Sequence, residues 1–417
     1  MKNKRIISVS SGKGGVGKTT FAINYALTLS QYGRTILVDL DTGTSSIRNV
    51  LDVEIRKDLY HFFKKNDPIE ECQNAIPEKW DPEGRFKEFT FIPGPAHFID
   101  EISNLTSKNK KKLIEAINNL EAKYIVLDIK AGLDPNVIDF LPFSNSGILI
   151  FTPHLPAATM AASDIVKAIL FRKLRIIFHP SSPLYNSIRG GQSISKLINS
   201  LIDTVEDTYD SSIPNLDAFL IDLKHALGEH PIIEIIQNIL EYFQVFYVLN
   251  MFNGIKNSYE KAVQPFITNL AKNVSSRFNT TNLGWIVESP EINKANSLRI
   301  PAIIYQKERK SPDKIAEEIN KLSYVYLGLK TEKTKKREIP PKYEKEEPEF
   351  ALDKQLTTLQ KMYEDLKGQN FRYNFEYISH RTLYLMKSKR VQDFGDCKIF
   401  TPDEFLSFIY NKVSQTK

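Results

Sequence analysis

The stretch "VSSGKGGVGKTT", residues 9–20, constrains the fold of this chain more than any other part of the sequence. It follows a short apolar run at residues 5–10 and precedes a segment with apolar residues at helical spacing, which ends near Gly33. A strand, a glycine-rich loop and a helix in that order are typical of a phosphate-binding unit. The sequence therefore predicts such a unit at the start of an α/β domain.

Further β-like runs alternate with helical patterns along most of the chain. Alternation of this kind favours a mostly parallel sheet that is covered by helices on both faces. We therefore predict a doubly wound α/β fold of the P-loop NTPase type. The predicted strands after the first one contain TILVDLD (35–41), FTFIP (89–93), YIVLD (124–128), GILIF (147–151), VFYVLN (245–250) and LGWIV (283–287).

The chain divides into three predicted parts. Residues 1–329 form the P-loop domain, and residues 176–243 interrupt the alternation with several helical patterns, which indicates a helical insertion at the sheet edge. Residues 330–350 combine Lys, Glu and Pro with few apolar residues, as solvated linkers do. Residues 351–417 regain apolar periodicity and predict a small C-terminal α/β or helical module. Within it we expect a long helix from Leu352, a strand in "KIF" and a final helix that opens at Thr401.

Composition excludes several classes of site. The only two cysteines, Cys72 and Cys397, lie far apart, so a disulfide framework, a zinc site and a self-contained iron–sulfur ligand set are not expected. The net charge of +6 is modest for 417 residues and permits contact with DNA or anionic lipid without requiring either. No run of 18 apolar residues is present, so we predict a cytoplasmic protein without a membrane span.

The glycine-rich loop matches the pattern G-x-x-x-x-G-K-[ST] through Gly12, Gly17, Lys18 and Thr19. Glycines allow backbone N–H groups to converge on phosphate oxygens, and the helix N-terminus adds its positive dipole end. Lys18 is expected to reach the β and γ phosphates, and the Thr19 hydroxyl to ligate Mg²⁺.

Lys13 is a second lysine that phosphate binding within one subunit does not need. With it, "KGGVGKTT" resembles the deviant Walker A motif of the MinD/ParA group of ATPases. The resemblance implies an ATP-sandwiched homodimer in which Lys13 touches the phosphates held by the partner subunit, and a catalytic role for Lys13 and Lys18. It also implies ATP and Mg²⁺ as cofactors, with nucleotide contacts from Gly12, Gly14, Gly15, Val16, Gly17, Lys18, Thr19 and Thr20.

Two further segments resemble the switches of this group. In "ILVDLDTGTSS", the resemblance implies that Asp41 orients the attacking water and that Asp39 supports the Mg²⁺ shell. In "YIVLDIKAGLD", it implies that Asp128 holds a Mg²⁺-bound water and that the Gly132 N–H senses the γ-phosphate. The implied metal ligands are thus Thr19, Asp39 and Asp128. Lys130 departs from the small residue or proline that is usual at its position, and either a phosphate contact or a solvent-facing role fits it.

Weaker motifs indicate the residues that contact the base of the nucleotide. "YVLNMF" resembles the strand end at which an Asn reads the adenine edge, which implies a base contact for Asn250. "SLRIPAIIY" resembles the later adenine-side loop around Pro301. "DLYHFF", "FIPGP" and the long helix "AATMAASDIVKAILFRKL" are most similar to the MinD/FlhG-type subgroup, which includes regulators of flagellar number and placement.

Neighbouring groups of the same superfamily fit less well. Iron–sulfur carriers need paired cysteines, tail-anchored-protein carriers a methionine-rich groove, and tyrosine kinases of this fold a tyrosine cluster, whereas this chain has 5 scattered Met and 18 dispersed Tyr. The lysine run at 108–112 leaves nonspecific DNA binding open. The final helix, with Asp403 and Glu404 at its start, favours packing within the tail over membrane binding.

Two functions remain open at this point. The first is a slow, partner-stimulated ATPase whose ATP-dependent dimerisation switches the positioning or assembly of a cellular structure of the cell-pole, flagellar, division or partition type. The second is a weakly hydrolysing nucleotide-binding scaffold that recruits protein partners through residues 176–243 and 351–417. The presence of Asp41 favours the first.

Overall fold

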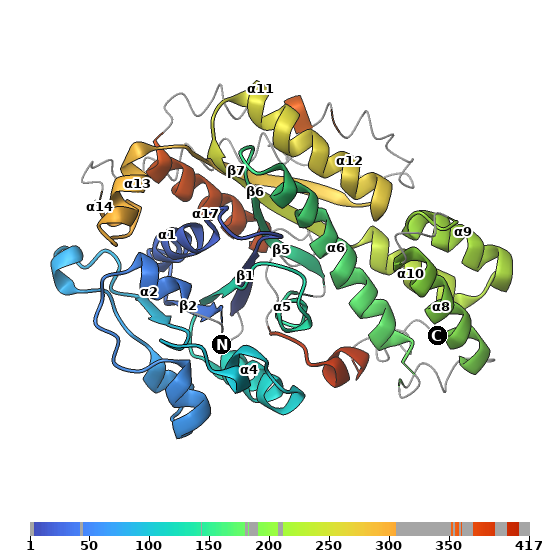
Figure 1. Ribbon diagram of the computed structural model, residues 1–417, viewed down its shortest axis with the longest axis horizontal. Helices are drawn as coiled ribbons and strands as arrows, with labels where there is room; N and C mark the ends of the chain where they lie inside the picture. The colour runs from blue at the N-terminus through green and yellow to red at the C-terminus, as the bar shows by residue number, and fades with distance from the viewer. Residues whose placement is uncertain are drawn as a thin grey trace, which may run out of the picture.

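The computed structural model describes most of the first 305 residues and parts of the C-terminal region. Its central feature is a seven-stranded sheet with the order β3-β2-β4-β1-β5-β6-β7 (Figure 1). Every neighbouring pair of these strands is parallel. The described residues are 4–41, 45–142, 144–179, 182, 191–206, 212–305, 352, 355–357, 360, 370–387 and 398–407.

All seven predicted strands are present, which confirms the predicted parallel α/β fold. Their bounds are β1 (Arg5–Ser10), β2 (Thr35–Leu40), β3 (Phe89–Ile92), β4 (Tyr124–Ile129), β5 (Asn145–Phe151), β6 (Gln244–Phe252) and β7 (Asn279–Val287). Strands of a parallel sheet are covered on both faces, so they read as continuous apolar runs rather than as alternating ones. β2, β4 and β5 accordingly have no exposed residue along their whole length.

Helices cover both faces of the sheet, which is the doubly wound arrangement. α1 (Lys18–Ser30) and α17 (Phe371–Lys387) lie side by side on one face, and α4 (Ser107–Asn119), α6 (Pro156–Ile177) and α12 (Gln264–Asn273) lie on the other (Figure 1). The remaining helical segments are short or belong to the insertion. They are α2 (Ser46–Val50), η1 (His61–Lys65), η2 (Ile69–Cys72), η3 (Glu78–Trp80), α3 (Asp100–Ser103), α5 (Pro135–Ile138), α8 (Gly191–Glu206), α9 (Leu216–Leu227), α10 (Pro231–Glu241), α11 (Ile255–Ser258), η4 (Tyr259–Val263), α13 (Pro290–Ser297) and α14 (Ala302–Tyr305).

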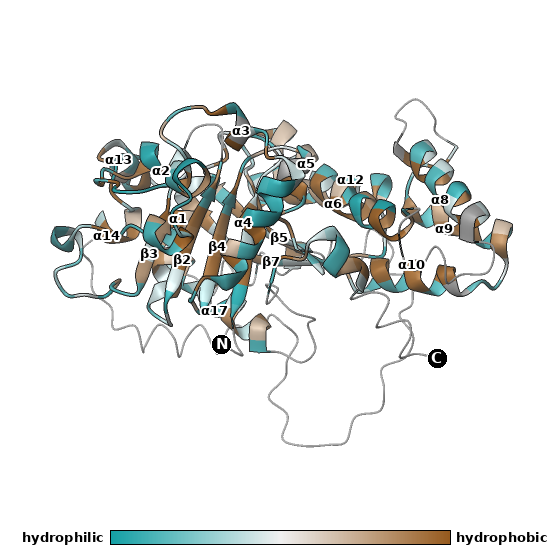
Figure 2. Cartoon of the chain, turned by 90° about the horizontal axis from the view of Figure 1, so that it is seen from below, coloured by the Kyte–Doolittle hydropathy of each residue, from teal (hydrophilic) through white to brown (hydrophobic). Residues whose placement is uncertain are grey.

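The predicted insertion between α6 and β6 is helical. Helices α8, α9 and α10 project from one edge of the molecule (Figure 2). α9 contacts both α8 and α10, and apolar residues of all three helices, such as Ile198, Leu220 and Ile236, are buried. The Asn215 side chain caps α9 by accepting hydrogen bonds from two N–H groups of its first turn. Asp217 then joins α9 to the segment after α12 through an ion pair with Arg277 (2.9 Å). The insertion is therefore fixed to the domain by polar contacts at its base.

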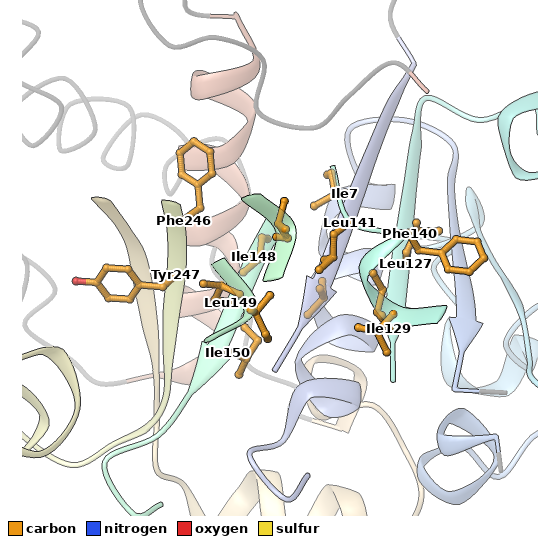
Figure 3. Packing of buried hydrophobic residues seen from close by; sticks show 14 of the residues in the cluster. Ile7, Leu127, Ile129, Phe140, Leu141, Ile148, Leu149, Ile150, Phe246 and Tyr247 are labelled. Atoms are coloured by element: carbon orange, nitrogen blue, oxygen red, sulfur yellow. The ribbon is translucent and has the colours of Figure 1, made fainter. Parts of the chain in front are cut away.

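The core of the domain lies around the central strands. Figure 3 shows buried aliphatic side chains of β1, β4 and β5 together with aromatic side chains of β6 and of the turn before β5, all of which belong to one apolar cluster. Ile7, Leu127 and Ile148 are at most 1% exposed, and so are Phe246 and Tyr247. This packing holds the carboxyl ends of the central strands in a fixed relation, and the glycine-rich loop starts at that edge.

The C-terminal region lies partly in this same core. α17 packs on α1 and β7, and 11 of its 17 residues are buried. Although residues 351–417 were assigned to a module of their own, the structure thus places α17 inside the packing of the α/β domain. The boundaries at 329 and 350 lie among residues that the structure does not describe, so the predicted division of the chain stays a prediction.

The end of the described chain also docks on the domain. Asn118 of α4 exchanges two hydrogen bonds with the backbone of Ile399, both 2.8 Å. The prediction of a strand in "KIF" is therefore wrong for residues 398–400, because their backbone pairs with a side chain and not with another strand. The predicted helix start is confirmed, since Thr401 and Glu404 exchange hydrogen bonds as in a capping box. The long helix expected from Leu352 lies mostly outside the described residues.

Candidate functional site

The glycine-rich loop connects β1 to α1 at the carboxyl edge of the sheet. Gly15 and Gly17 have φ angles of 83° and 79°, a left-handed conformation that residues with a Cβ adopt only at a cost. Gly12 lies against the backbone of Ala161 on α6, where a Cβ would clash. The loop therefore needs glycine at these three positions for backbone geometry and for close packing, as a phosphate cradle does.

Lys18 is the first residue of α1 and is only 8% exposed. Its ammonium forms an ion pair with the carboxylate of Asp128 near the end of β4, which is fully buried. Thr19 donates a hydrogen bond to the Ser46 hydroxyl (3.0 Å), and Ser46 donates to the other oxygen of Asp128 (3.3 Å). The structure thus brings together the predicted phosphate lysine and two of the predicted metal ligands.

Asp39 lies directly beside this group, because β2 and β4 pair Asp39 with Asp128 in register. It is fully buried and accepts hydrogen bonds from the Ser45 hydroxyl (2.8 Å) and from the backbone N–H groups of Asp41 (3.0 Å) and Ile47 (3.2 Å). Burial, and then the negative charge of Asp128, raise the pKa of Asp39 to about 7, although these hydrogen bonds oppose the rise. When both carboxyls are ionised, Asp39 and Asp128 carry two negative charges, whereas Lys18 supplies one positive charge, to Asp128.

This pair predicts an unusual pH dependence for the protein without ligands. A carboxyl whose pKa is higher in the folded than in the unfolded state binds the extra proton between the two values, so the stability it contributes is lost as the pH rises. We expect the free energy of unfolding to fall by on the order of 1–3 kcal/mol between pH 4 and pH 7 because of Asp39. Denaturant titrations at both pH values check this. In Asp39→Asn that loss should be absent, and an equal loss in both proteins would contradict the assignment.

The residues at this place fit a magnesium ion. Hydroxyl and carboxylate oxygens are the ligands that Mg²⁺ prefers, and its sites usually combine one or two carboxylates with water and phosphate oxygens. Thr19 and Asp128, with Asp39 behind them, provide such a set, and a divalent cation would compensate the excess charge. Over the part of the chain that the structure describes, no group of three or more His, Cys, Asp and Glu residues converges as a metal cage would.

The second switch contacts the glycine-rich loop directly. The Gly132 N–H donates to the Ser11 carbonyl (3.0 Å), and Gly132 has a φ of 113°. The group predicted to sense the γ-phosphate is therefore satisfied by the loop here, and it must leave Ser11 in order to act as predicted. Lys130 is exposed, which agrees with the solvent-facing alternative.

Lys13 differs from Lys18 in its surroundings. Its side chain is exposed, and its carbonyl accepts a hydrogen bond from the Ser11 hydroxyl (3.0 Å). None of the ion pairs among the described residues involves Lys13.

Asp41 is partly buried and follows β2, directly before residues 42–44, which are not described. Gly14 is also exposed and Thr20 lies in the first turn of α1, and their predicted contacts with the nucleotide stay predictions.

The predicted base-side residues lie beyond the loop. The Asn250 amide, near the end of β6, donates a hydrogen bond to the Val16 carbonyl (2.7 Å) and so stabilises the glycine-rich loop. Its predicted base contact stays a prediction. Pro301 is buried before α14, and the Ile303 N–H donates to the Asn24 side chain on α1 (2.9 Å). The base-side loop is thus fastened to the same helix that begins at Lys18.

Some contacts of the site were not predicted. Ser45 and Ser46 bind the two buried carboxylates, and Asn24 and Ala161 hold the surroundings of the loop. The small residues after Asp41 indicated a switch segment, but nothing in their spacing shows which hydroxyl meets which carboxylate. Leu133, Leu155 and Met160, which follow the carboxyl ends of β4 and β5, are 46%, 39% and 42% exposed. Such apolar side chains around a polar loop indicate a face that another surface can cover.

Comparisons with known proteins show similarity over the part of the chain that contains this site. Residues 4–174 match the family model described as "AAA domain". A putative septum site-determining protein MinD from Tupiella akineta is 30% identical over 156 residues, which cover 37% of this chain and 49% of that protein. The MinD protein of Escherichia coli strain K12 is 27% identical over 181 residues, 43% of this chain and 64% of that protein. Over residues 4–174 the chain is thus similar to AAA domains and to septum site-determining MinD proteins.

This similarity confirms the resemblance that the motifs indicated. The matched part of the chain spans about half to two thirds of the length of these curated MinD relatives. Among solved structures, MinD of Pyrococcus horikoshii, determined in complex with Mg-ADP, has a TM-score of 0.44 and 19% identity, with 77% of this chain and 98% of that chain covered. No helix in the described ranges of this MinD-like chain is long and apolar enough to cross a membrane.

Proposed function

We propose that this chain is an ATPase that binds ATP with Mg²⁺, dimerises around the bound nucleotide and is reset by slow, partner-stimulated hydrolysis. The observation that carries the proposal is the difference between the two lysines of one loop. Lys18 is buried against the carboxylate of Asp128 in the candidate metal site, whereas Lys13 is exposed in the first half of the loop. This contrast supports a role for Lys18 within its own subunit and a role for Lys13 toward a second subunit.

The residues divide the work of the proposed reaction as follows. Lys18 leaves Asp128 and neutralises phosphate charge, while Thr19, Asp128 and Asp39 hold the Mg²⁺ ion, which supplies charge compensation for phosphoryl transfer. Asp41 orients the attacking water. Gly132 exchanges the Ser11 carbonyl for the γ-phosphate and so reports on the nucleotide.

The proposed dimer face is the one that surrounds the glycine-rich loop. Exposed Leu133, Leu155 and Met160 support it, because a partner that covers the loop would also remove these side chains from water. The dimer is proposed to position or assemble a cellular structure, of the kind that septum site-determining MinD proteins and flagellar regulators serve. A cytoplasmic protein at the membrane or nucleoid surface agrees with this role. Of the lysine run on α4 for which nonspecific DNA binding was left open, Lys108 and Lys111 are exposed, while Lys110 is paired with Asp139.

The second candidate is a nucleotide-binding scaffold that hydrolyses little and recruits partners through its additional elements. The acidic surface of the insertion favours it, since Asp222, Glu229 and Glu234 are exposed there. The two functions share the nucleotide site and differ in whether phosphate is released.

Phosphate release by the wild type and by Asp41→Ala separates the two functions. Because Asp41 orients water while Lys18 and Thr19 keep the phosphate cradle, we expect Asp41→Ala to bind ATP within about threefold of wild type and to hydrolyse it about 10²-fold more slowly. The matched control is Asp52→Ala, a carboxylate of the same segment that is 75% exposed. Equal rates for wild type and Asp41→Ala would contradict the assigned catalysis, and no phosphate release by wild type with any partner would favour the scaffold.

A further inference from the structure

α17 is fitted closely to β7. The Asn374 side chain of α17 is 1% exposed and accepts a hydrogen bond from the Val287 N–H (3.2 Å). Gly284 allows this approach, because a Cβ at that position would lie 2.8 Å from the Ile378 side chain. Backbone N–H groups in a protein interior need partners, and here a side chain supplies the one that the end of β7 needs. Asn374 therefore fixes the last residue of the edge strand.

The same helix contacts α1 along its length. The Phe375 ring lies 5.8 Å from that of Phe21, in the first turn of α1 beside Lys18 and Thr19. Farther along, Tyr25 donates a hydrogen bond to Thr382 (2.9 Å), and the Tyr32 hydroxyl meets the His380 ring (2.7 Å). α17 thus joins the helix that begins at the phosphate loop to the strand at the edge of the sheet.

The backbone after Val287 leads to the base-side residues. Ser289 caps α13 through the Glu291 N–H (3.2 Å), and α13 runs on to the loop around Pro301. That loop returns to α1 through the hydrogen bond between Ile303 and Asn24. α17 therefore contacts α1, which begins at the phosphate loop, and β7, whose end leads into the predicted base-side residues.

We propose that Asn374 is a positioning residue of the nucleotide site. By fixing the end of β7, it sets the path of the backbone into α13 and Pro301, and so the place of the base relative to the phosphate cradle. This proposal rests on the proposed function, since it assumes that the site binds ATP. It gives the C-terminal helix a part in nucleotide recognition.

Affinities for two probes test this role. The first probe is a non-hydrolysable ATP analogue with Mg²⁺, and the second is inorganic triphosphate with Mg²⁺, which offers only the phosphate part. In the full chain, Asn374→Ala should lower the affinity for the ATP analogue about tenfold. The buried Val287 N–H loses its acceptor in this variant, so the base-side segment that follows β7 shifts. Binding of triphosphate should stay within about twofold of wild type.

Two further variants show whether the effect is specific. Asn374→Asp, measured at a pH at which the buried carboxyl is protonated, keeps an acceptor oxygen without adding charge and should recover most of the lost affinity for the ATP analogue. Tyr32→Phe removes one hydrogen bond of α17 at the opposite end of α1 and should leave both affinities within about twofold. Thermal unfolding without ligand shows that each variant is folded.

The outcomes separate this proposal from the proposed function. Suppose that the wild type binds both probes. If Asn374→Ala then lowers the affinities for the two probes equally, or lowers neither affinity, α17 only supports the fold and the positioning role is wrong. If the wild type binds neither probe, the proposed function fails and the role of Asn374 fails with it.

Discussion

Lys18→Ala is expected to abolish ATP binding, with an affinity at least about 10²-fold below that of wild type. The ammonium of Lys18 is paired with the buried carboxylate of Asp128 and lies at the start of α1, where the phosphates are proposed to bind. Without it, the phosphate charge loses a charge-assisted contact that contributes about 1.5–3 kcal/mol, and it meets the uncompensated carboxylate of Asp128. Isothermal titration calorimetry with ATP and Mg²⁺ measures the loss.

The control for this change lies in the second switch. Lys130→Ala removes an exposed lysine from the same edge of the sheet and should leave the affinity for ATP within about twofold. A Lys18→Ala protein that is folded and binds ATP within a few fold of wild type would show that the glycine-rich loop is not the nucleotide site.

Lys13→Ala is expected to keep ATP binding and to lose the dimer. The exposed side chain of Lys13 leaves the contacts of Lys18 and Thr19 intact, so one subunit still holds its nucleotide. A charge-assisted contact to phosphate contributes about 1.5–3 kcal/mol. Because a symmetric dimer contains two such contacts, their loss should weaken association by about two to four orders of magnitude.

The sheet and its loop could be predicted from the sequence because each strand is a short apolar run with clear ends. Parallel strands with both faces covered read as continuous apolar runs that are easy to recognise, and Gly12, Gly15 and Gly17 stand where the backbone needs them. The order of the strands follows from the structure, as does the pairing that sets Asp39 beside Asp128.

The place of α17 could not be predicted for a physical reason. Its buried face contains Asn374, Glu376 and Arg381, which do not form an apolar stripe and are accepted in the interior through particular partners. The segment "KIF" shows the reverse case. It is apolar enough to suggest a strand, yet the backbone of Ile399 forms hydrogen bonds with the Asn118 side chain. No local sequence pattern predicts this contact.

In the candidate site, too, the sequence predicts some residues and misses individual side-chain contacts. The spacing of Lys18 and Thr19 fixes their place at the start of α1, so their roles could be assigned from the motif. Asn250 was assigned by its position at a strand end, and its hydrogen bond to the Val16 carbonyl became visible only in three dimensions. Such contacts depend on how separate loops meet at the sheet edge.

The most direct measurement is the dissociation constant of the dimer, determined by sedimentation equilibrium with ATP and Mg²⁺. We expect wild-type protein to be monomeric without nucleotide and dimeric at saturating ATP, and Lys13→Ala to bind ATP yet stay monomeric at concentrations where wild type is paired. A wild-type mass that does not change with ATP, or a Lys13→Ala protein that dimerises as tightly as wild type, would contradict the proposed ATP-sandwiched dimer.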